Sequence, residues 1–557
     1  MNNNHLSFFK IAACLFLCFL LASTNAQDNN SKAGKKPNIL FCIADDASFQ
    51  HFSAYGFGLT SWVKTPGFDR VAKEGLLFNR AYTPNAKCAP SRACILTGRN
   101  SWQLEAAGNH NAIFPEKFSS FIEVLGKHGY LTGYTGKGWA PGNSGTTDGK
   151  PRLLTGPNYS TLKTKTPTGG ISPIDYAANF SEFLKNKPAD QPFCFWFGSH
   201  EPHRQYDYGS GMAVGNKKIT DITAVPPFWI DNETVRNDML DYAYELEYYD
   251  SQVVKMLDLL ERTGELDNTI IVVTSDNGMP FPRVKGHMYD YDNHLPLAIM
   301  WKNHIVSPGR KINDFVSFID YAPTFLEVAG INASDEMQPI QGKSLTNYFT
   351  SKNRIATRDH VLLGREREDV GRPHDEGYPV RAIVKGNYFY SINFKPDRWP
   401  SGNPETGYLD TDGSPTKSEI LAANRNGAYH NLWVMDFGKK PAEELYQTDK
   451  DPYSIKNLSN DPAFAKIKAG LKAQLERELK TQQDPRMFGK GDVFDNYPYA
   501  EPRVINFYER YMKGEMPVPN FVRATDFEKP GFDPATPKKT APIKLKSKLS
   551  KSGILKN

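Results

Sequence analysis

"PNILFCIADD", residues 37–46, is an apolar run that ends in two carboxylates, Asp45 and Asp46. Its apolar residues do not alternate with polar ones, which is typical of a strand buried on both faces of a sheet. Three further stretches show the same pattern: "PFCFWFG" (192–198), "NTIIVVTS" (268–275) and "LPLAIMW" (295–301). We expect these stretches to form strands of one sheet.

Helical patterns lie between these strands. The clearest covers residues 241–264, where one face carries Leu246, Tyr249, Val253, Met256, Leu257 and Leu260. Strands that alternate with helices predict an α/β fold, with a large, mostly parallel sheet flanked by helices. After about residue 350 the sequence changes to aromatic, turn-rich segments such as "YPVRAIVKGNYFYSINF" (378–394), so we expect a smaller C-terminal α+β domain.

The length of 557 residues calls for at least two domains, because single hydrophobic cores stop growing at about 250–300 residues. We predict an α/β domain over 37–350, an α+β domain over 351–523 and a basic, disordered tail over 524–557. Seven lysines and no acid lie in 538–557, so this tail accounts for the net charge of +5. The body of the chain is not basic, and we expect no nucleic-acid partner.

The first 26 residues differ in composition from the rest. After Lys10 comes the apolar run "IAACLFLCFLLAS" of 13 residues, and "TNAQ" supplies the small residues of a signal-peptidase site after Ala26. We predict a signal peptide over 1–26, a linker over 27–36, and export to the periplasm or the medium. The run is too short to cross a bilayer and no later segment has the pattern of a membrane span, so we expect no stable membrane insertion.

Polar residues follow two of the predicted strands. Asp45 and Asp46 end the first, and Asp276 and Asn277 end "NTIIVVTSDN" (268–277). In sheets of this kind, ligands collect beyond the carboxyl ends of the strands. Three carboxylates and an amide are hard oxygen ligands, which suit Ca²⁺ and also Mg²⁺. Zinc is disfavoured because the chain lacks cysteines and histidines with suitable spacing.

"KCAPSRACILTGRN" (87–100) places Cys88 in a polar turn ahead of an apolar stretch. A thiol is a poor ligand for a hard metal, so Cys88 is either incidental or converted into an oxygen group. "CAPSR" followed by "LTGR" resembles the signature Cys-x-Pro-Ser-Arg-x-x-x-x-Thr-Gly of the type I, formylglycine-dependent sulfatases. In that family a separate maturation enzyme oxidises the cysteine to formylglycine (3-oxoalanine), whose hydrate is the nucleophile.

Further motifs extend the resemblance over most of the chain. In order they are "PNILFCIADD", "GYTGKG", "EPHR", "TSDNG", "VKGHMYDYDNHLPL" and "ELYQTDKDPYSIKNL". Within the family, "HEPHRQY" and "SDNGMPFPR" are most similar to heparan N-sulfatase-like enzymes and to bacterial polysaccharide sulfatases of the ulvan type. The resemblance implies the alkaline-phosphatase-like sulfatase fold.

The resemblance also implies a role for each matching residue. Arg92 would hold residue 88, and Lys137 and Lys285 would bind sulfate oxygens. His203 would bind sulfate or protonate the leaving oxygen, and His200 would contact the substrate. The metal ligands would be Asp45, Asp46, Asp276, Asn277 and the converted Cys88.

One position departs from the family pattern. Members commonly read Gly-Lys-x-His, but "GKGWAPG" places Trp139 where that histidine would stand. The histidine usually contacts the formylglycine hydroxyl and can act as its base. His110, in "AAGNHNAIF", is our candidate to replace it. The alternative is that His110 is a structural histidine whose hydrogen bonds are satisfied within a loop.

These observations lead to one functional expectation and several alternatives. We expect an exported, Ca²⁺-dependent sulfatase that acts on a sulfated polysaccharide or its oligosaccharides, such as an algal ulvan-type glycan or a glycosaminoglycan. An N-sulfoglucosamine sulfohydrolase would cut a C–N–S linkage instead. A phosphonate or phosphate monoester hydrolase of the same superfamily is a second alternative, and a non-catalytic glycan-binding protein with an unmodified Cys88 is a third.

Overall fold

A computed structural model of the chain describes residues 35–56, 62–352, 356 and 358–532. The described residues from Pro37 onward belong to one compact unit. The predicted signal peptide (1–26), nearly all of the linker and residues 533–557 of the predicted tail lie outside the described residues. The start of that tail is packed, because Asp526 is fully buried and accepts a hydrogen bond from Ser418 Oγ at 3.0 Å.

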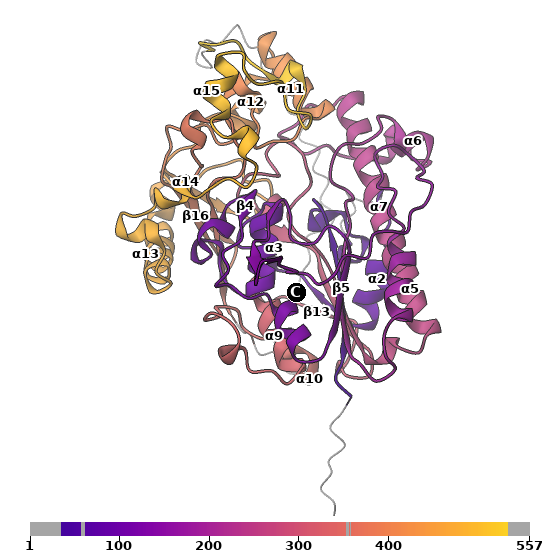
Figure 1. The fold of residues 1–557 in the computed structure, drawn as a ribbon. Helices are drawn as coiled ribbons and strands as arrows, with labels where there is room; N and C mark the ends of the chain where they lie inside the picture. The colour runs from indigo at the N-terminus through magenta and orange to yellow at the C-terminus, as the bar shows by residue number, and fades with distance from the viewer. Residues whose placement is uncertain (1–34, 57–61, 353–355, 357, 533–557) are drawn as a thin grey trace, which may run out of the picture. The chain divides into compact units, whose positions relative to one another are not determined.

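A seven-stranded sheet forms the centre of the fold (Figure 1). Its spatial order is β13 (Arg310–Ile312), β2 (Leu76–Phe78), β12 (Leu297–Trp301), β10 (Thr269–Ser275), β1 (Asn38–Ala44), β9 (Phe193–Gly198) and β5 (Leu131–Gly136). The four strands from β10 to β5 are parallel to one another, as the sequence predicts. Strand β12 runs antiparallel to both of its neighbours, so the sheet is mixed.

Helices cover both faces of this sheet (Figure 1). Side chains of β1 alternate between two hydrophobic clusters, with Leu40 and Cys42 in one and Ile39, Phe41 and Ile43 in the other. The first cluster includes α2 (Pro66–Glu74), α5 (Tyr176–Lys185) and α7 (Glu233–Arg262). The second includes α3 (Cys88–Thr97), α4 (Phe121–Lys127) and α9 (Tyr321–Val328). Burial on both faces explains why β1 is apolar throughout.

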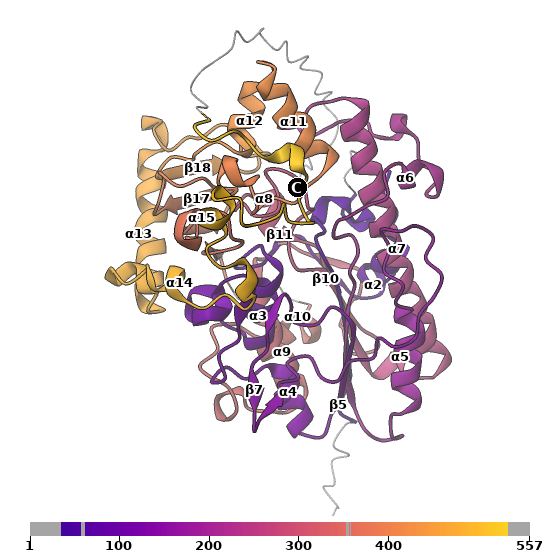
Figure 2. The same cartoon turned by 45° about the horizontal axis from the view of Figure 1, so that its top comes forward.

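A smaller antiparallel sheet follows in the chain. Its strands are β15 (His360–Arg365), β16 (Val380–Lys385), β17 (Tyr388–Asn393) and β18 (Glu443–Gln447), in that order. Helix α13 (Ala465–Thr481) buries a stripe of leucines against this sheet, namely Leu471, Leu475 and Leu479. Figure 2 shows α13 beside β17 and β18. This arrangement confirms the smaller α+β part of the fold.

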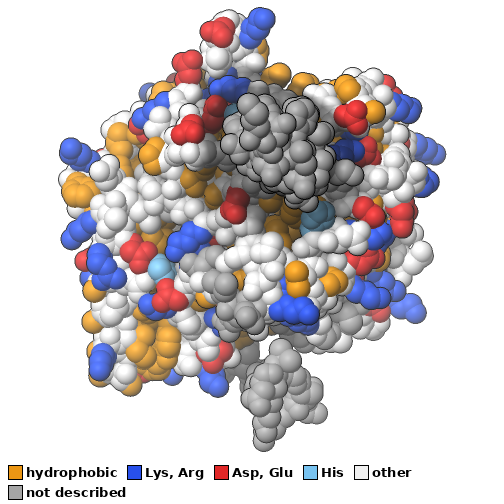
Figure 3. Space-filling view, turned by 90° about the horizontal axis from the view of Figure 1, so that it is seen from below, with side chains coloured by type: hydrophobic (Ala, Val, Ile, Leu, Met, Phe, Trp, Pro, Cys, Tyr) orange, Lys and Arg blue, Asp and Glu red, His pale blue; other side chains and the backbone are white. Residues whose placement is uncertain are grey.

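Shorter elements connect these layers. They are β3 (Ala81–Tyr82), β4 (Ala112–Ile113), β6 (Gly142–Asn143), β7 (Thr146–Thr147), β8 (Lys150–Pro151), β11 (His294–Leu295), β14 (Val316–Ser317), α6 (Ser210–Ala213), α8 (Asp290–Asn293), α10 (Thr346–Thr350), α11 (Pro415–Arg425), α12 (His430–Asp436), α14 (Val493–Asn496) and α15 (Phe507–Met512). Within the described part of the chain, each helix is too short or too polar to span a membrane. On the face drawn in Figure 3, acidic and basic side chains are interspersed.

The parallel strands bring their carboxyl ends to one edge of the sheet. Ala44 pairs with Ser275, and Ile43 and Gly136 both pair with Gly198. A Cβ atom at Gly198 would lie 1.8 Å from the carbonyl oxygen of Lys137, so only glycine allows this close approach. The segments that follow β1, β5, β9 and β10 therefore emerge side by side.

Candidate active site

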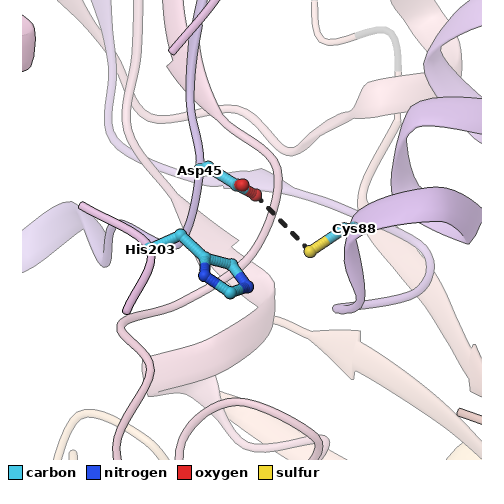
Figure 4. Close-up of side chains that lie close together, drawn as sticks. All are labelled: Asp45, Cys88 and His203. Carbon is cyan, nitrogen blue, oxygen red and sulfur yellow. Dashed lines mark hydrogen bonds between the residues drawn. The ribbon is translucent and has the colours of Figure 1, made fainter. Parts of the chain in front are cut away.

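Cys88 is the first residue of α3 and lies beside the end of β1 (Figure 4). Its thiol donates to Asp45 Oδ1 at 3.4 Å and lies 3.8 Å from Asp46 Oδ1. Cys88 is only 1% exposed. Burial, followed by the charge of Asp45, raises the pKa of the thiol well above its usual range. An unmodified Cys88 is therefore a protonated thiol and a weak nucleophile.

Three buried carboxylates form the floor of the site. Asp45, Asp46 and Asp276 each offer an oxygen, and these oxygens lie within 4.8 Å of one another. Asn277 donates through Nδ2 to Asp46 Oδ1 at 2.6 Å, while its buried Oδ1 has no hydrogen-bond partner in the part of the chain that the structure describes. Hard oxygen donors with one orphaned amide oxygen fit a Ca²⁺ or Mg²⁺ ion.

The pKa values of Asp45 and Asp276 are shifted in opposite directions by their surroundings. Burial disfavours ionisation of Asp45, but Lys137, then His203 and Arg92, hold its pKa well below the usual range. Burial and the neighbouring charge of Asp45 raise the pKa of Asp276 to about 7. A bound cation would favour the ionised form of each carboxylate.

Two lysines reach the carboxylates from different strands. Lys137, which follows β5, places Nζ 2.6 Å from Asp45 Oδ2. Lys285 lies after β10 and places Nζ 2.7 Å from Asp46 Oδ2 and 2.8 Å from Asp412 Oδ2. Both ammonium groups are thus fixed cations at the carboxyl edge of the sheet.

Arg92 lies one helical turn after Cys88 and is fully buried. Its Nε donates to Asp276 Oδ2 at 2.8 Å, and its Nη1 donates to the carbonyl oxygens of Lys137 and Gly138 at 2.8 and 2.9 Å. The guanidinium therefore joins α3 to the ends of β10 and β5. The family resemblance implies that Arg92 also binds residue 88 directly, and this contact stays a prediction.

A cavity of about 560 Å³ opens over these groups. Its wall includes seven of the eleven predicted site residues, namely Asp45, Cys88, His110, Lys137, His200, His203 and Lys285. The other four, Asp46, Arg92, Asp276 and Asn277, are buried behind this wall. Residues that sequence reasoning missed also line it: Lys87, Ser172, Asp369, Asp412, Tyr499, Glu501, Val504, Phe507 and Phe521. Many of these come from the C-terminal part of the chain, and no spacing in the sequence links them to Cys88.

The two histidines after β9 differ in position. His203 Nε2 lies 3.9 Å from Asp46 Oδ2, and its Nδ1 is 2.6 Å from the carbonyl oxygen of Arg204. That carbonyl accepts a hydrogen bond from Nδ1–H, which leaves Nε2 facing the acids. His200 is an exposed residue in the cavity wall, and its main-chain N–H donates to the hydroxyl of Tyr176 at 3.1 Å.

Trp139 occupies a structural position beside the site. Its indole Nε1 donates to the carbonyl oxygen of Ala89 at 3.0 Å, and its ring packs edge-on against Phe114 with centroids 5.1 Å apart. The indole thus fastens the start of α3, and it offers no basic nitrogen. His110 lines the cavity and places Nδ1 3.3 Å from Asp369 Oδ1.

The sequence of this chain is similar to a known protein family over the part that forms the main sheet. The model of the sulfatase family matches residues 37–331. The chain belongs to the sulfatase family. This sulfatase is accordingly a sulfuric ester hydrolase, as the sequence motifs predict.

Curated relatives of this sulfatase match over most of their length. An ulvan-active sulfatase of Formosa agariphila is 27% identical over 475 residues, which cover 83% of this chain and 84% of that protein. The N-sulphoglucosamine sulphohydrolase of Homo sapiens is 27% identical over 542 residues, which cover 88% of this chain and 98% of that protein.

Solved structures share the fold of this sulfatase. A protein solved in complex with its substrate D-glucosamine-2-N,6-O-disulfate matches with a TM-score of 0.57 at 20% identity, over 81% of this chain and 99% of that one. A 2-O glycosaminoglycan sulfatase matches with a TM-score of 0.58 at 19% identity, over 81% and 93%. These likenesses confirm the alkaline-phosphatase-like sulfatase fold.

Proposed function

We propose that this sulfatase removes sulfate groups from a sulfated polysaccharide or its oligosaccharides. The observation that carries the proposal is the position of Cys88, whose sulfur lies 3.4 Å from Asp45 Oδ1 in a cavity that Lys137 and Lys285 also line. A volume of about 560 Å³ leaves room for a sugar unit beyond the sulfate. The names of relatives that act on ulvan and on sulfated glucosamine support the same substrate class.

The nucleophile in this proposal is a converted Cys88. A separate maturation enzyme would oxidise Cys88 to formylglycine, and the hydrated aldehyde would supply the attacking hydroxyl. Support comes from the buried thiol, whose raised pKa keeps it protonated and makes it a weak nucleophile without conversion. The motif around Cys88 is that of enzymes in which this conversion occurs.

The residues of the acid cluster would hold a Ca²⁺ or Mg²⁺ ion. The ligands would be Asp45, Asp46, Asp276 and Asn277, with residue 88 completing the set after conversion. When bound, such an ion supplies a Lewis acid that stabilises negative charge on sulfate oxygens. Support comes from the hard oxygen donors and from the orphaned Asn277 Oδ1.

The remaining side chains would bind and orient the sulfate group. Lys137 and Lys285 would place their ammonium groups against sulfate oxygens, where charge develops in the transition state. His203 would donate a proton from Nε2 to the leaving oxygen, and His200 would contact the sugar. His110 would take the place of the histidine that Trp139 replaces.

The N-terminal sequence supports a site of action outside the cytoplasm. The basic start, the apolar run and the small residues before Gln27 support export by a signal peptide, so that the enzyme would work in the periplasm or in the medium. Polymeric sulfated glycans are found outside cells, which agrees with that destination.

Sulfate release from defined oligosaccharides tests the proposal. Converted enzyme, with residue 88 checked by mass spectrometry, is incubated with O-sulfated and N-sulfated oligosaccharides of known structure, and free sulfate is measured by ion chromatography. Release from an O-sulfated substrate supports the proposed activity, and release from N-sulfated substrates alone assigns the sulfamidase alternative. Absence of release from every sulfated glycan would contradict the proposed substrate class.

A further inference from the structure

His110 is held in the cavity wall by a segment distant in sequence. Its main-chain N–H donates to the carbonyl oxygen of Arg367 at 3.0 Å, and Asn109 Oδ1 accepts from the N–H of Arg367 at 3.2 Å. The 109–110 loop is therefore fastened to the segment that follows β15. Since the His110 side chain is only 10% exposed, the ring cannot rotate freely into solvent.

Asp369 lies at the end of that segment and is bound through both carboxylate oxygens. Oδ1 lies 3.3 Å from His110 Nδ1, and Oδ2 lies 2.8 Å from Lys87 Nζ. The main-chain N–H of Asp369 donates to Asp410 Oδ1 at 3.0 Å, and Lys87 Nζ also donates to the carbonyl oxygen of Asp410 at 3.3 Å. These contacts fix the position of the carboxylate relative to Lys87, which immediately precedes Cys88.

The charge state of this pair determines which nitrogen of His110 carries the proton. Burial disfavours ionisation of Asp369, but Lys87 and His110 hold its pKa below the usual range, so the carboxylate only accepts hydrogen bonds. Burial lowers the pKa of His110, which favours the neutral ring. A neutral ring that donates Nδ1–H to Asp369 keeps a lone pair on Nε2, and this buried Nε2 has no hydrogen-bond partner among the described residues.

We propose that Asp369 is a positioning residue that holds His110 with its proton on Nδ1, so that Nε2 serves as a proton acceptor in the cavity. This inference rests on the proposed function. The proton would come from a hydroxyl group of residue 88 after conversion: its O–H bond breaks, the electron pair stays on oxygen, and Nε2 receives the proton. The imidazolium that forms is stabilised by Asp369, as a carboxylate stabilises the histidine of a catalytic triad.

The tautomer of His110 can be measured without sulfatase activity. Unconverted protein with ¹⁵N-labelled histidine is compared with Asp369→Asn by two-dimensional NMR at a pH where the ring is neutral, with His110→Gln to assign the signals. We expect the proton on Nδ1 in the wild type and a shift toward Nε2 in the variant, because the asparagine amide can donate to Nδ1. A wild-type ring with its proton on Nε2, or an unchanged tautomer in Asp369→Asn, would overturn the proposal.

Kinetics of the converted enzyme give a second readout. We expect Asp369→Asn and His110→Gln each to lower kcat by about 10²–10⁴-fold with little change in KM, the range for one general acid or base. The double variant should be no slower than the slower single variant, since both remove the same function. A higher KM with unchanged kcat would assign a substrate contact instead.

Asp290→Asn is the matched control. Asp290 Oδ2 lies 3.1 Å from His294 Nδ1 in a similarly buried pair that does not line the cavity, so we expect kcat to be retained. If Asp369→Asn does not fold, two other measurements test the proposal. They are the tautomer of the wild type and the kcat of His110→Gln, a variant that keeps the Lys87–Asp369 pair. If the wild type releases no sulfate, the proposed function fails while the NMR result still stands.

Discussion

Ala44 and Ser275 are paired in register on neighbouring parallel strands, and the main-chain N–H of Asp276 donates to the carbonyl oxygen of Ala44 at 3.2 Å. This pairing sets Asp45 beside Asp276 although the two residues are far apart in sequence. Three acidic side chains are thereby buried together beside fixed lysine and arginine cations, and their oxygens, which lie within 4.8 Å of one another, form a hard donor set that suits a divalent metal ion.

Removal of divalent metal should abolish sulfate release, and Ca²⁺ or Mg²⁺ should restore it better than Zn²⁺. Asp276→Asn should weaken Ca²⁺ binding by at least about 10–100-fold, because it removes one charged ligand. Isothermal titration calorimetry on chelator-treated protein measures this affinity.

Asp250→Asn is the control for this experiment. Asp250 is also buried, but it accepts hydrogen bonds from the N–H groups of Gly67 and Phe68 at 2.7 and 2.8 Å. We expect this variant to bind Ca²⁺ like the wild type. Full turnover by enzyme that elemental analysis shows to be metal-free would contradict the metal assignment.

Lys285→Met should lower kcat by about 10²–10³-fold, because it removes a fixed cation from the position where charge develops on sulfate. Steady-state sulfate release measures the effect. Lys187→Met is the control, since the Lys187 side chain is only 5% exposed, against 2% for Lys285, and pairs with Glu265 Oε1 at 3.0 Å outside the cavity. Equal losses of kcat in the two variants would show that the effect is structural.

His51 should make stability depend on pH. Burial lowers its pKa to about 3, whereas an unfolded histidine titrates near about 6.5. Between these pH values the unfolded state binds more protons than the folded state. His51 should therefore lower the free energy of unfolding by up to about 1.4 kcal/mol for each unit by which the pH falls. We expect the stability advantage of the wild type over His51→Gln, measured by urea unfolding, to shrink as pH falls from about 6.5 to 4. A constant difference would contradict this.

The strands of the main sheet and the acidic residues at their ends were predictable, because local sequence patterns encode both. Continuous apolar runs identify strands buried on both faces, and Asp45 and Asp276 follow two such runs directly. The antiparallel direction of β12 was not predictable, because a buried strand has the same composition in either direction. Cys88 was expected in a polar turn, yet it begins α3, where Pro90 fits because the first helical turn needs no donor from it.

The rest of the site depends on packing between distant segments. Asp369 and Asp412 reach the cavity only because the segments after β15 and β17 lie against the edge of the main sheet. Neither residue belongs to a motif, and an isolated aspartate in a turn-rich sequence carries no signal. Lys87 is similarly hidden, since a lysine before a helix is usually solvated, whereas here it is 1% exposed and paired with Asp369.

Whether converted Cys88 performs the reaction can be measured directly from the dependence of sulfate release on conversion. Enzyme is prepared with graded amounts of the maturation enzyme, the converted fraction of residue 88 is determined by peptide mass spectrometry, and sulfate release is measured for each preparation. We expect activity proportional to the converted fraction, with none in unconverted protein or in a folded Cys88→Ala variant. Full activity in unconverted protein or in Cys88→Ala would contradict it.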